Sequence, residues 1–228
     1  DAKYPVQLIV AGKAHPYDEE GKRLVQALAQ FAERPEVMDR VVFLEDYEMF
    51  LAQELVAGID VWMNTPRRLL EASGTSGMKV LVNGGLNLSE LDGWWAEAYT
   101  PAVGWAIGGE GLEPDPQRDP LEAEQLYQNL ELRIIPEFYD RDQDGVPRKW
   151  IDRVRASMSI LTSHFNSNRM MREYVEHAYL PAAEAYRARI ANDAGLAKEL
   201  GVWHDTLREN WKGLRFGNLR VVPSGENY

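Results

Sequence analysis

The fold class follows from the stretch "RVVFLEDYEMFLAQELVAGIDVWMN", Arg40 to Asn64. Two short apolar runs, 40–46 and 60–64, open and close it, and each is typical of a strand buried on both faces. The segment between them has the length of a short helix and ends at Gly58, a common residue just past a helix. This strand, helix, strand order predicts parallel strands joined by a right-handed crossover.

The same pattern extends toward the amino terminus. "VQLIVAG", Val6 to Gly12, predicts a first strand, and "DEEGKRLVQALAQFAER", 18–34, predicts a helix in which Asp18 can cap the first turn. Together these segments predict an α/β fold with a doubly wound, Rossmann-like parallel sheet. Ligands of such sheets bind beyond the carboxyl ends of the strands, so the loops after the strands are the places to search for a site.

The second half of the chain has a different character. "GGEGLEPDPQRDP", 108–120, predicts a surface loop, and the segments 121–139, 150–165 and 168–193 predict helices. We expect the first of these helices to end at Pro136 and Pro181 to kink or break the third, because proline disrupts a helix interior.

The domain organisation follows from this change. We expect an α/β domain over residues 1–165 and a C-terminal helical segment over 166–228. The last residues, "LRFGNLRVVPSGENY", resemble the start of a strand that has no partner. The first residues, "DAKYPVQLIV", lack a Met and enter the predicted first strand almost at once. We therefore expect the chain to be truncated at both ends.

Composition excludes several classes of function. The 36 acidic residues outnumber the 25 basic ones, for a net charge of −11, which argues against nucleic acid as the main partner. The absence of cysteine excludes disulfides, thiolate catalysis and Cys-rich zinc sites, and it favours a cytoplasmic location. No signal peptide and no membrane-spanning apolar run is present, so we expect no membrane partner.

One motif, "EASGTSGMK" from Glu71 to Lys79, carries the chemistry. Its glycines allow a tight turn, and a helix that begins near Thr75 would direct free backbone N–H groups at an anion such as phosphate. Lys79 could then clamp that phosphate or form a covalent bond through its amine. The alternative is a glycine-rich turn before a core helix with a solvated Lys79, and spacing alone favours that alternative. The motif matches neither the Walker loop nor the Rossmann fingerprint.

These residues, followed by "NGGLNLSELDGWW", resemble the pyridoxal-phosphate segment of the α-glucan phosphorylases. The segments "AGKAHP", "VVFLEDYEMFLAQELVAGIDVWMNTPRR" and "FNSNRMMREYVEHAYLP" resemble others of that family, in the same order. The resemblance implies a GT-B fold, of which this chain would be most of the C-terminal half, and pyridoxal phosphate as cofactor. The implied reaction is phosphorolysis of an α-1,4-glucan, such as glycogen or maltodextrin, by orthophosphate to glucose 1-phosphate. A homodimer is implied for the full-length enzyme.

The resemblance also implies site residues. Lys79 matches the lysine that is covalently linked to pyridoxal phosphate, and Glu71 is the second residue expected to act in catalysis. The other cofactor contacts implied are Thr75, Ser76, Gly77 and Tyr47, and the glucosyl contacts implied are Glu71, Ala72, Ser73 and Gly74. The basic motif that clamps the substrate phosphate in the family is absent from the chain, and so is the glucan-binding half. We therefore expect the chain to be inactive alone.

Two other functions stay open. A nucleotide-sugar glucan synthase would carry a second acid eight residues after Glu71, but this position is Lys79. A non-catalytic glucan-binding module would be expected to have a degraded cofactor segment, and this segment is intact.

Four further features have plainer explanations. "DRDQDG", 140–145, imitates a calcium loop, but its twelfth position is Ile151 instead of glutamate, so a turn is preferred. The histidines, among them His15 on a loop at the ligand-facing edge, have no metal-ligand spacing. Trp94 and Trp95 are expected in the core, and Arg67 and Arg68 in solvent.

Overall fold

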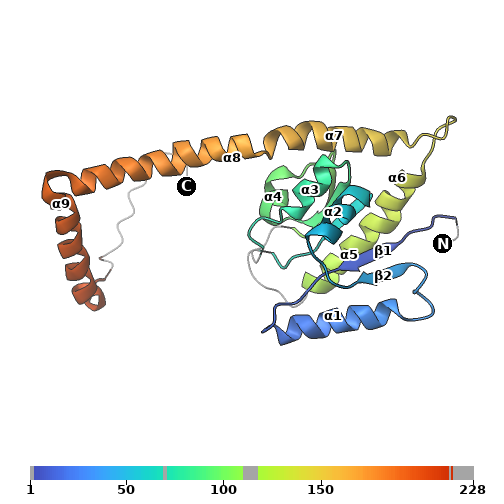
Figure 1. Ribbon diagram of the computed structural model, residues 1–228, viewed down its shortest axis with the longest axis horizontal. Helices are drawn as coiled ribbons and strands as arrows, with labels where there is room; N and C mark the ends of the chain where they lie inside the picture. Colours follow the sequence, from blue (N-terminus) through green and yellow to red (C-terminus); the bar gives the residue numbers. More distant parts are fainter. Residues whose placement is uncertain (1–2, 69–70, 110–117, 216, 218–228) are drawn as a thin grey trace. The chain divides into compact units, whose positions relative to one another are not determined.

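A computed structural model describes residues 3–68, 71–109, 118–215 and 217 (Figure 1). The chain divides into two compact units, Asp1–Asn166 and Ser167–Tyr228.

The first unit is an α/β structure with parallel strands. β1 (Leu8–Ala11) pairs with β2 (Val41–Leu44) in one sheet, and β3 (Val61–Asn64), β4 (Leu86–Glu90) and β5 (Gly104–Ile107) form a second sheet in the order β3-β4-β5. All of these pairs are parallel, which confirms the predicted α/β class with parallel strands.

The first three strands were expected in one sheet, and this expectation was wrong. Among the described residues β3 pairs with β4, and no ladder joins it to β1 or β2. The strands β4 and β5 were not predicted at all. Every residue of β4 is buried, so it offers β3 a partner that is shielded from water on both faces.

The helices of the first unit match most of the predicted segments. They are α1 (Glu19–Ala32), α2 (Met49–Gly58), α3 (Ser76–Val82), α4 (Gly93–Ala98), α5 (Arg118–Asn129), α6 (Ile135–Tyr139) and α7 (Arg148–His164). Asp18 caps α1 as predicted, since its Oδ1 accepts a hydrogen bond of 2.8 Å from the backbone N–H of Gly21.

The core surrounds β4 and β5. Trp94, Trp95 and Leu161 belong to one buried cluster, and Trp105 and Trp150 belong to another. Trp95 is fully buried, and its indole N–H donates a hydrogen bond of 3.1 Å to the carbonyl of Trp105. The core position predicted for Trp94 and Trp95 is confirmed.

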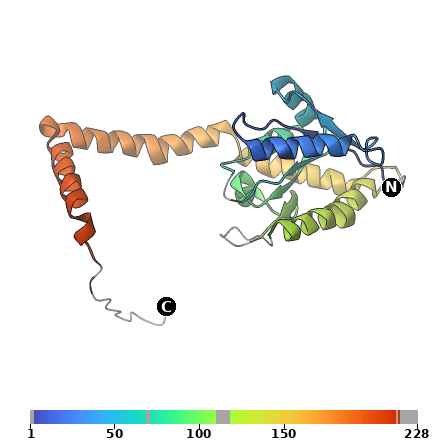
Figure 2. The same cartoon turned by 90° about the horizontal axis from the view of Figure 1, so that it is seen from below.

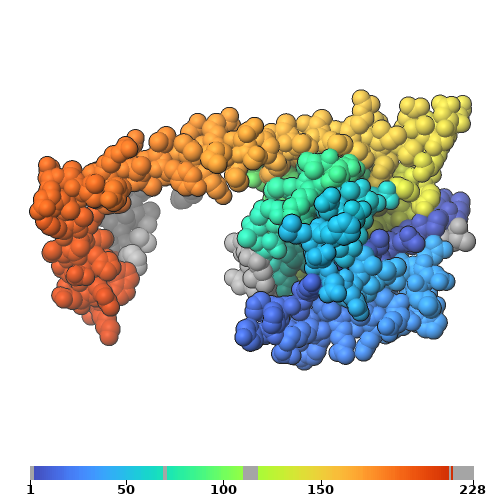
Figure 3. Space-filling model, in the orientation of Figure 1, coloured from blue at the N-terminus to red at the C-terminus, as the bar shows by residue number. Residues whose placement is uncertain are grey.

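The sheet of β1 and β2 was expected to be buried on both faces, and this was wrong. Ile9 and Val42 face each other in the register, and both are about 40% exposed. The helix α1 contacts β2, but it leaves its own Leu24 and Leu28 exposed. Figure 3 shows α1 in blue and α2 in lighter blue at the surface of this unit. One face of this two-stranded sheet thus lacks a cover among the described residues.

Pro136 does not end its helix, contrary to our expectation. The α5 helix passes into a π-helical turn, η1 (Leu130–Ile134), and then into α6, with Pro136 in the first turn of α6. A wider turn removes the clash between a proline ring and the carbonyl four residues before it, and proline needs no N–H partner there.

The second unit repeats this arrangement. Its first helix, α8 (Ser167–Tyr174), passes through the π turn η2 (Val175–Tyr179) into α9 (Leu180–Asn210), with Pro181 in the first turn of α9. The chain therefore stays helical through Pro181, as it does at Pro136, with a π turn in place of the predicted kink or break. A short 3₁₀ turn, η3 (Trp211–Gly213), follows α9.

The helix α9 is bent. Ala191 has an extended backbone, and Asn192, Asp193 and Ala194 have positive φ angles of 52 to 58°, so the ribbon turns sharply there (Figure 2). This bend coincides with the end predicted for the helix. The strand predicted within 214–228 and most of the loop 108–120 lie outside the described residues. None of the described helices is both long and apolar enough to cross a membrane.

Candidate active site at the carboxyl end of β4

The motif from Glu71 to Lys79 forms the turn between β3 and α3, beyond the carboxyl end of β3. The helix α3 begins at Ser76 with Thr75 in the N-cap position, within one residue of the predicted start. The Thr75 side chain makes no capping hydrogen bond. Of the predicted site residues, Glu71, Ala72, Thr75 and Lys79 are exposed, Ser73, Gly74 and Ser76 are half-buried, and Gly77 is buried.

The first turn of α3 lies directly on β4. The Asn87 side-chain amide donates a hydrogen bond of 3.2 Å to the carbonyl of Gly77. A Cβ on Gly77 would lie 2.5 Å from Asn87 Oδ1 and 3.0 Å from the ring of Trp94. Only glycine allows this approach, so the residue type at position 77 sets how close the helix comes to the sheet.

The loop after β4 holds the preceding part of the motif. The backbone N–H of Trp94 donates a hydrogen bond of 2.9 Å to the carbonyl of Ser73, and the N–H of Glu71 lies 3.4 Å from Asp92 Oδ2. Gly93 has φ of +51°, and a Cβ there would collide with the carbonyl of Ser73. Residues 92–94, which follow the carboxyl end of β4, therefore hold the backbone of residues 71–73 in place.

The side chains of Glu71 and Lys79 are both exposed at this turn. Within the described part of the chain, neither side chain makes a hydrogen bond or ion pair. A carboxylate can accept hydrogen bonds from a sugar diol. An amine can bind an anion, or form a covalent bond with an aldehyde when it is unprotonated. The turn thus presents two reactive groups on a backbone that the core holds in place.

Other predicted residues lie outside this cluster. Tyr47 is half-buried in the segment between β2 and α2. His15 is exposed after β1, and its Nδ1 accepts a hydrogen bond of 3.3 Å from the backbone of Tyr17.

The two arginines after β3 differ from each other. Arg67 is 74% exposed and lies 3.4 Å from Asp119, in line with the predicted position in solvent. Arg68 instead donates a hydrogen bond to the carbonyl of Gly109, which corrects that prediction. The reason is that the loops after β3 and β5 both leave the same edge of the sheet.

Sequence reasoning missed Glu90, the last residue of β4. Its side chain is 1% exposed, and neither carboxylate oxygen has a hydrogen-bond partner within the described residues. Burial, and secondarily the charge of Glu122, raises the pKa of Glu90 from 4.5 to about 7, although Arg118 and Arg68 oppose the change. A Glu that ends an apolar run just before Asp-Gly is the signal that could have revealed it.

The acidic loop at 140–145 is a turn, as predicted. Asp142 Oδ1 accepts hydrogen bonds of 2.9 Å from the N–H groups of Asp144 and Val146. Its other oxygen lies 2.5 Å from Arg148 Nε, and this hydrogen bond holds the pKa of Asp142 below its ordinary value. In the ranges the structure describes, no group of three or more His, Asp or Glu side chains could hold a metal ion.

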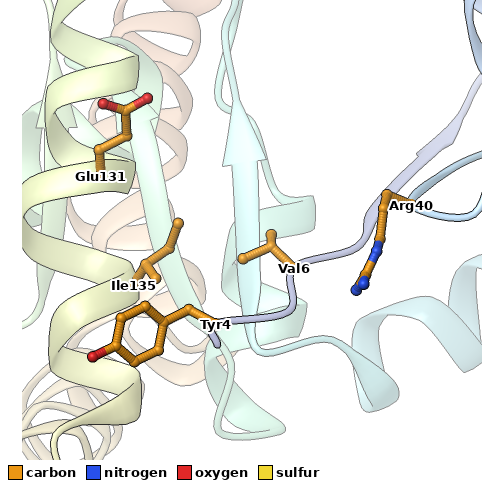
Figure 4. A pocket seen from close by; sticks show the side chains of 5 residues that line it. All are labelled: Tyr4, Val6, Arg40, Glu131 and Ile135. Carbon is orange, nitrogen blue, oxygen red and sulfur yellow. The ribbon is translucent and has the colours of Figure 1, made fainter. Parts of the chain in front are cut away.

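Two hollows in the first unit lie elsewhere. One of about 360 Å³ is lined by Tyr4, Val6, Arg40, Glu131 and Ile135 (Figure 4). Val6 and Arg40 precede β1 and β2, so this hollow is at the amino ends of those strands. A second, of about 790 Å³, includes Gly104 at the start of β5. No predicted site residue lines either hollow, so the candidate site rests on the 71–79 turn.

Comparison with known proteins gives consistent results. The family model described as carbohydrate phosphorylase matches residues 1–102. The glycogen phosphorylase of Mycobacterium tuberculosis is 44% identical over 220 residues, which is 96% of this chain and 26% of that protein. The glycogen phosphorylase of Aquifex aeolicus is 48% identical over 78% of this chain and 26% of its own length.

A maltodextrin phosphorylase is also similar. The protein of that name from Thermococcus litoralis is 40% identical over 91% of this chain and 24% of its own length. The chain thus spans about a quarter of the length of the curated relatives it matches.

Proposed function

The chain belongs to the carbohydrate phosphorylase family, and from this premise we propose that it serves the phosphorolysis of an α-1,4-glucan. In that reaction orthophosphate takes the terminal glucosyl residue, the glycosidic bond to the next residue breaks, and the glycosidic oxygen receives a proton. The products are glucose 1-phosphate and a glucan shorter by one residue. Glycogen and maltodextrin are the substrate classes proposed, with the cytoplasm as the location.

The observation that carries the proposal is the backbone clamp on the 71–79 turn. The Trp94–Ser73 hydrogen bond and the Asn87–Gly77 hydrogen bond attach this segment at two points, Ser73 to α4 and Gly77 to β4. Glu71 and Lys79 then project from a rigid support instead of a free loop. Catalytic groups held in this way lose little entropy when a substrate binds.

The residues present fit pyridoxal phosphate, the cofactor that the family implies. We propose that Lys79 holds its aldehyde end and that the backbone of Thr75, Ser76 and Gly77 meets its phosphate, with Tyr47 beside its ring. The Lys79 amine is exposed and makes no ion pair within the described residues, so it is accessible for that bond. When bound, the cofactor supplies a phosphate group that acts as an acid and base beside the substrate phosphate.

The protein's own residues bind and orient the sugar. We propose that Glu71 accepts hydrogen bonds from the glucosyl hydroxyls, and that the backbone of Ala72, Ser73 and Gly74 borders the same sugar. Because Asp92 and Trp94 hold the backbone at 71 and 73, the sugar contacts are fixed relative to Lys79. Positioning and electrostatic complementarity contribute most of the rate enhancement in transfers of this kind.

At the level of architecture, we propose a Rossmann-like, doubly wound domain that forms the C-terminal half of a GT-B fold. Residues 1–165 would hold the cofactor and phosphate, and residues 166–228 would be a helical segment. A nucleotide-sugar glucan synthase is the second candidate. It is disfavoured because Lys79 occupies the position of that class's second acid.

The test uses the natural gene product that carries this chain. The protein would be incubated with pyridoxal phosphate, maltodextrin and orthophosphate, and glucose 1-phosphate would be assayed. We expect release in the unmodified protein, none in Lys79→Ala, and unchanged release in Lys22→Ala, an exposed lysine of α1. Release that requires a nucleotide sugar, or that survives Lys79→Ala, would contradict the proposal.

A further inference from the structure

The carboxyl group of Glu90 lies against the loop that leaves β5. Glu90 pairs with Ile107 in the β4–β5 register, and a Cβ on Gly108 would collide with all the atoms of the Glu90 carboxyl group. The Gly108 N–H donates a hydrogen bond of 2.7 Å to Gln125 Oε1, so it is not directed at the carboxyl group. The Glu90 side chain is therefore buried beside Gly108. Among the described residues, no group donates a hydrogen bond to either of its carboxylate oxygens.

Two guanidinium groups meet at the next residue. Arg68, from the segment after β3, donates a hydrogen bond to the carbonyl of Gly109, and Arg118 Nη2, from α5, lies 3.4 Å from the same oxygen. Arg118 Nε also donates to Glu122 Oε1 at 2.6 Å. The carbonyl that both arginines contact thus belongs to the residue after Gly108, the glycine against which the Glu90 carboxyl group lies.

The balance of charge around Glu90 is close to even. Within the described ranges, the charged groups that face it are Arg68 from the segment after β3, Asp92 from the loop after β4, and Arg118 and Glu122 from α5. Two cations and two anions sum to zero when Glu90 is protonated, and to −1 when it is ionised. A buried, ionised carboxylate without a hydrogen bond is unfavourable, whereas one bonded to a guanidinium is well stabilised.

We propose that Glu90 is a positioning residue: its ionisation draws Arg68 and Arg118 from the carbonyl of Gly109 to the carboxyl end of β4. Arg68 lies three residues before Glu71, whose backbone N–H is held by Asp92. Asp92 also belongs to the charged groups that face Glu90, so a change in the charge of Glu90 reaches the 71–79 turn through the contact of Asp92 with the Glu71 N–H. The coupling is a property of the chain's own loops, and it does not depend on the proposed reaction.

The first experiment is a titration of Glu90 in the chain, labelled with carbon-13 at the glutamate carboxyl groups and followed by NMR. The resonance that disappears in Glu90→Gln identifies the residue. We expect a midpoint near pH 7. In Arg68→Gln and in Arg118→Gln we expect the midpoint to rise by about one unit, because each change removes a cation that favours the carboxylate. Arg67→Gln is the matched control and should leave the midpoint unchanged, since its side chain is exposed and pairs with Asp119.

The second measurement follows the backbone amide resonances of Glu71 and Ser73 between pH 6 and 8. We expect them to shift with the midpoint of Glu90 in the unmodified chain and to stay constant in Glu90→Gln. A Glu90 midpoint that ignores Arg68→Gln and Arg118→Gln would overturn the proposal. Amide shifts that persist in Glu90→Gln, or that are absent from the unmodified chain, would overturn it equally. The arginine variants keep the test decisive if Glu90→Gln fails to fold.

Discussion

The backbone N–H of Trp94 donates a hydrogen bond of 2.9 Å to the carbonyl oxygen of Ser73. Trp94 is only 5% exposed and packs against Trp95 and Phe165, so this bond connects the 71–79 turn directly to the core. The backbone that presents Glu71 is consequently tied to the first turn of α4. Core stability and site geometry should change together when this contact is altered.

Gly93→Ala tests that connection. The residue has φ of +51°, and the added Cβ would collide with the carbonyl of Ser73, so the turn must move or the helix α4 must shift. We expect the free energy of unfolding to fall by about 2–3 kcal/mol, from strain plus the weakened hydrogen bond. Urea denaturation measures this loss. Gly12→Ala is the control, because nothing lies within 4 Å of its Cβ position. Equal losses of unfolding free energy in Gly93→Ala and Gly12→Ala would refute a specific role for the contact between residues 93–94 and Ser73.

Glu90 predicts a dependence of stability on pH. Its pKa is about 7 in the folded chain against 4.5 for the unperturbed group. Between these values the folded state binds a proton that the unfolded state does not, so stability falls as pH rises from about 4.5 to 7 and is constant above. The expected loss attributable to Glu90 is on the order of 3 kcal/mol over the whole range, most of it between pH 5 and pH 8. Urea denaturation at pH 5 and pH 8 measures this difference in the free energy of unfolding. In Glu90→Gln the contribution of Glu90 to the difference should disappear. If the free energy of unfolding falls equally from pH 5 to pH 8 in the unmodified protein and in Glu90→Gln, Glu90 is not the group responsible.

The sequence was sufficient for segments whose pattern is local. The helices α1, α2 and α7 follow from apolar spacing and end signals, and each lies within two residues of its predicted bounds. The start of α3 follows from Gly74, Thr75 and Ser76 because turn chemistry is also local. The same reasoning found the turn that forms the candidate site.

What the sequence did not reveal depends on contacts between distant segments. In β4 the residues Asn87, Ser89 and Glu90 interrupt the apolar pattern, yet all are buried because α3 and β5 cover them. The roles of Asp92 and Glu90 likewise arise from contacts with segments about 20 residues away. The partition of the strands into two sheets depends on β4 and could not be predicted without it.

Arg153→Lys should lower stability without affecting the 71–79 turn. Arg153 binds Glu137 through two hydrogen bonds of 2.8 Å, and its guanidinium lies 4.6 Å from the ring centre of Trp105. A lysine can make neither the paired contact nor the same stacking. We expect a loss of about 1–2 kcal/mol in the free energy of unfolding. Arg155→Lys, two residues along α7 and exposed, should cost almost nothing, and thermal unfolding of both variants is the comparison.

Glu71→Gln separates sugar binding from cofactor retention in the natural gene product that carries this chain. The Glu71 side chain is exposed and precedes the residues proposed to hold pyridoxal phosphate, so the change should leave the cofactor on Lys79. A hydrogen bond from a sugar hydroxyl to a charged acceptor contributes about 1.5–3 kcal/mol, which corresponds to a fall of about 10- to 100-fold in kcat/KM for phosphorolysis. Borohydride reduction and peptide mapping should still find the pyridoxyl label on Lys79. Glu20→Gln, an exposed acid of α1, is the control and should change neither result. A loss of label in Glu71→Gln would instead assign Glu71 to the cofactor, and an unchanged kcat/KM would remove it from the sugar site.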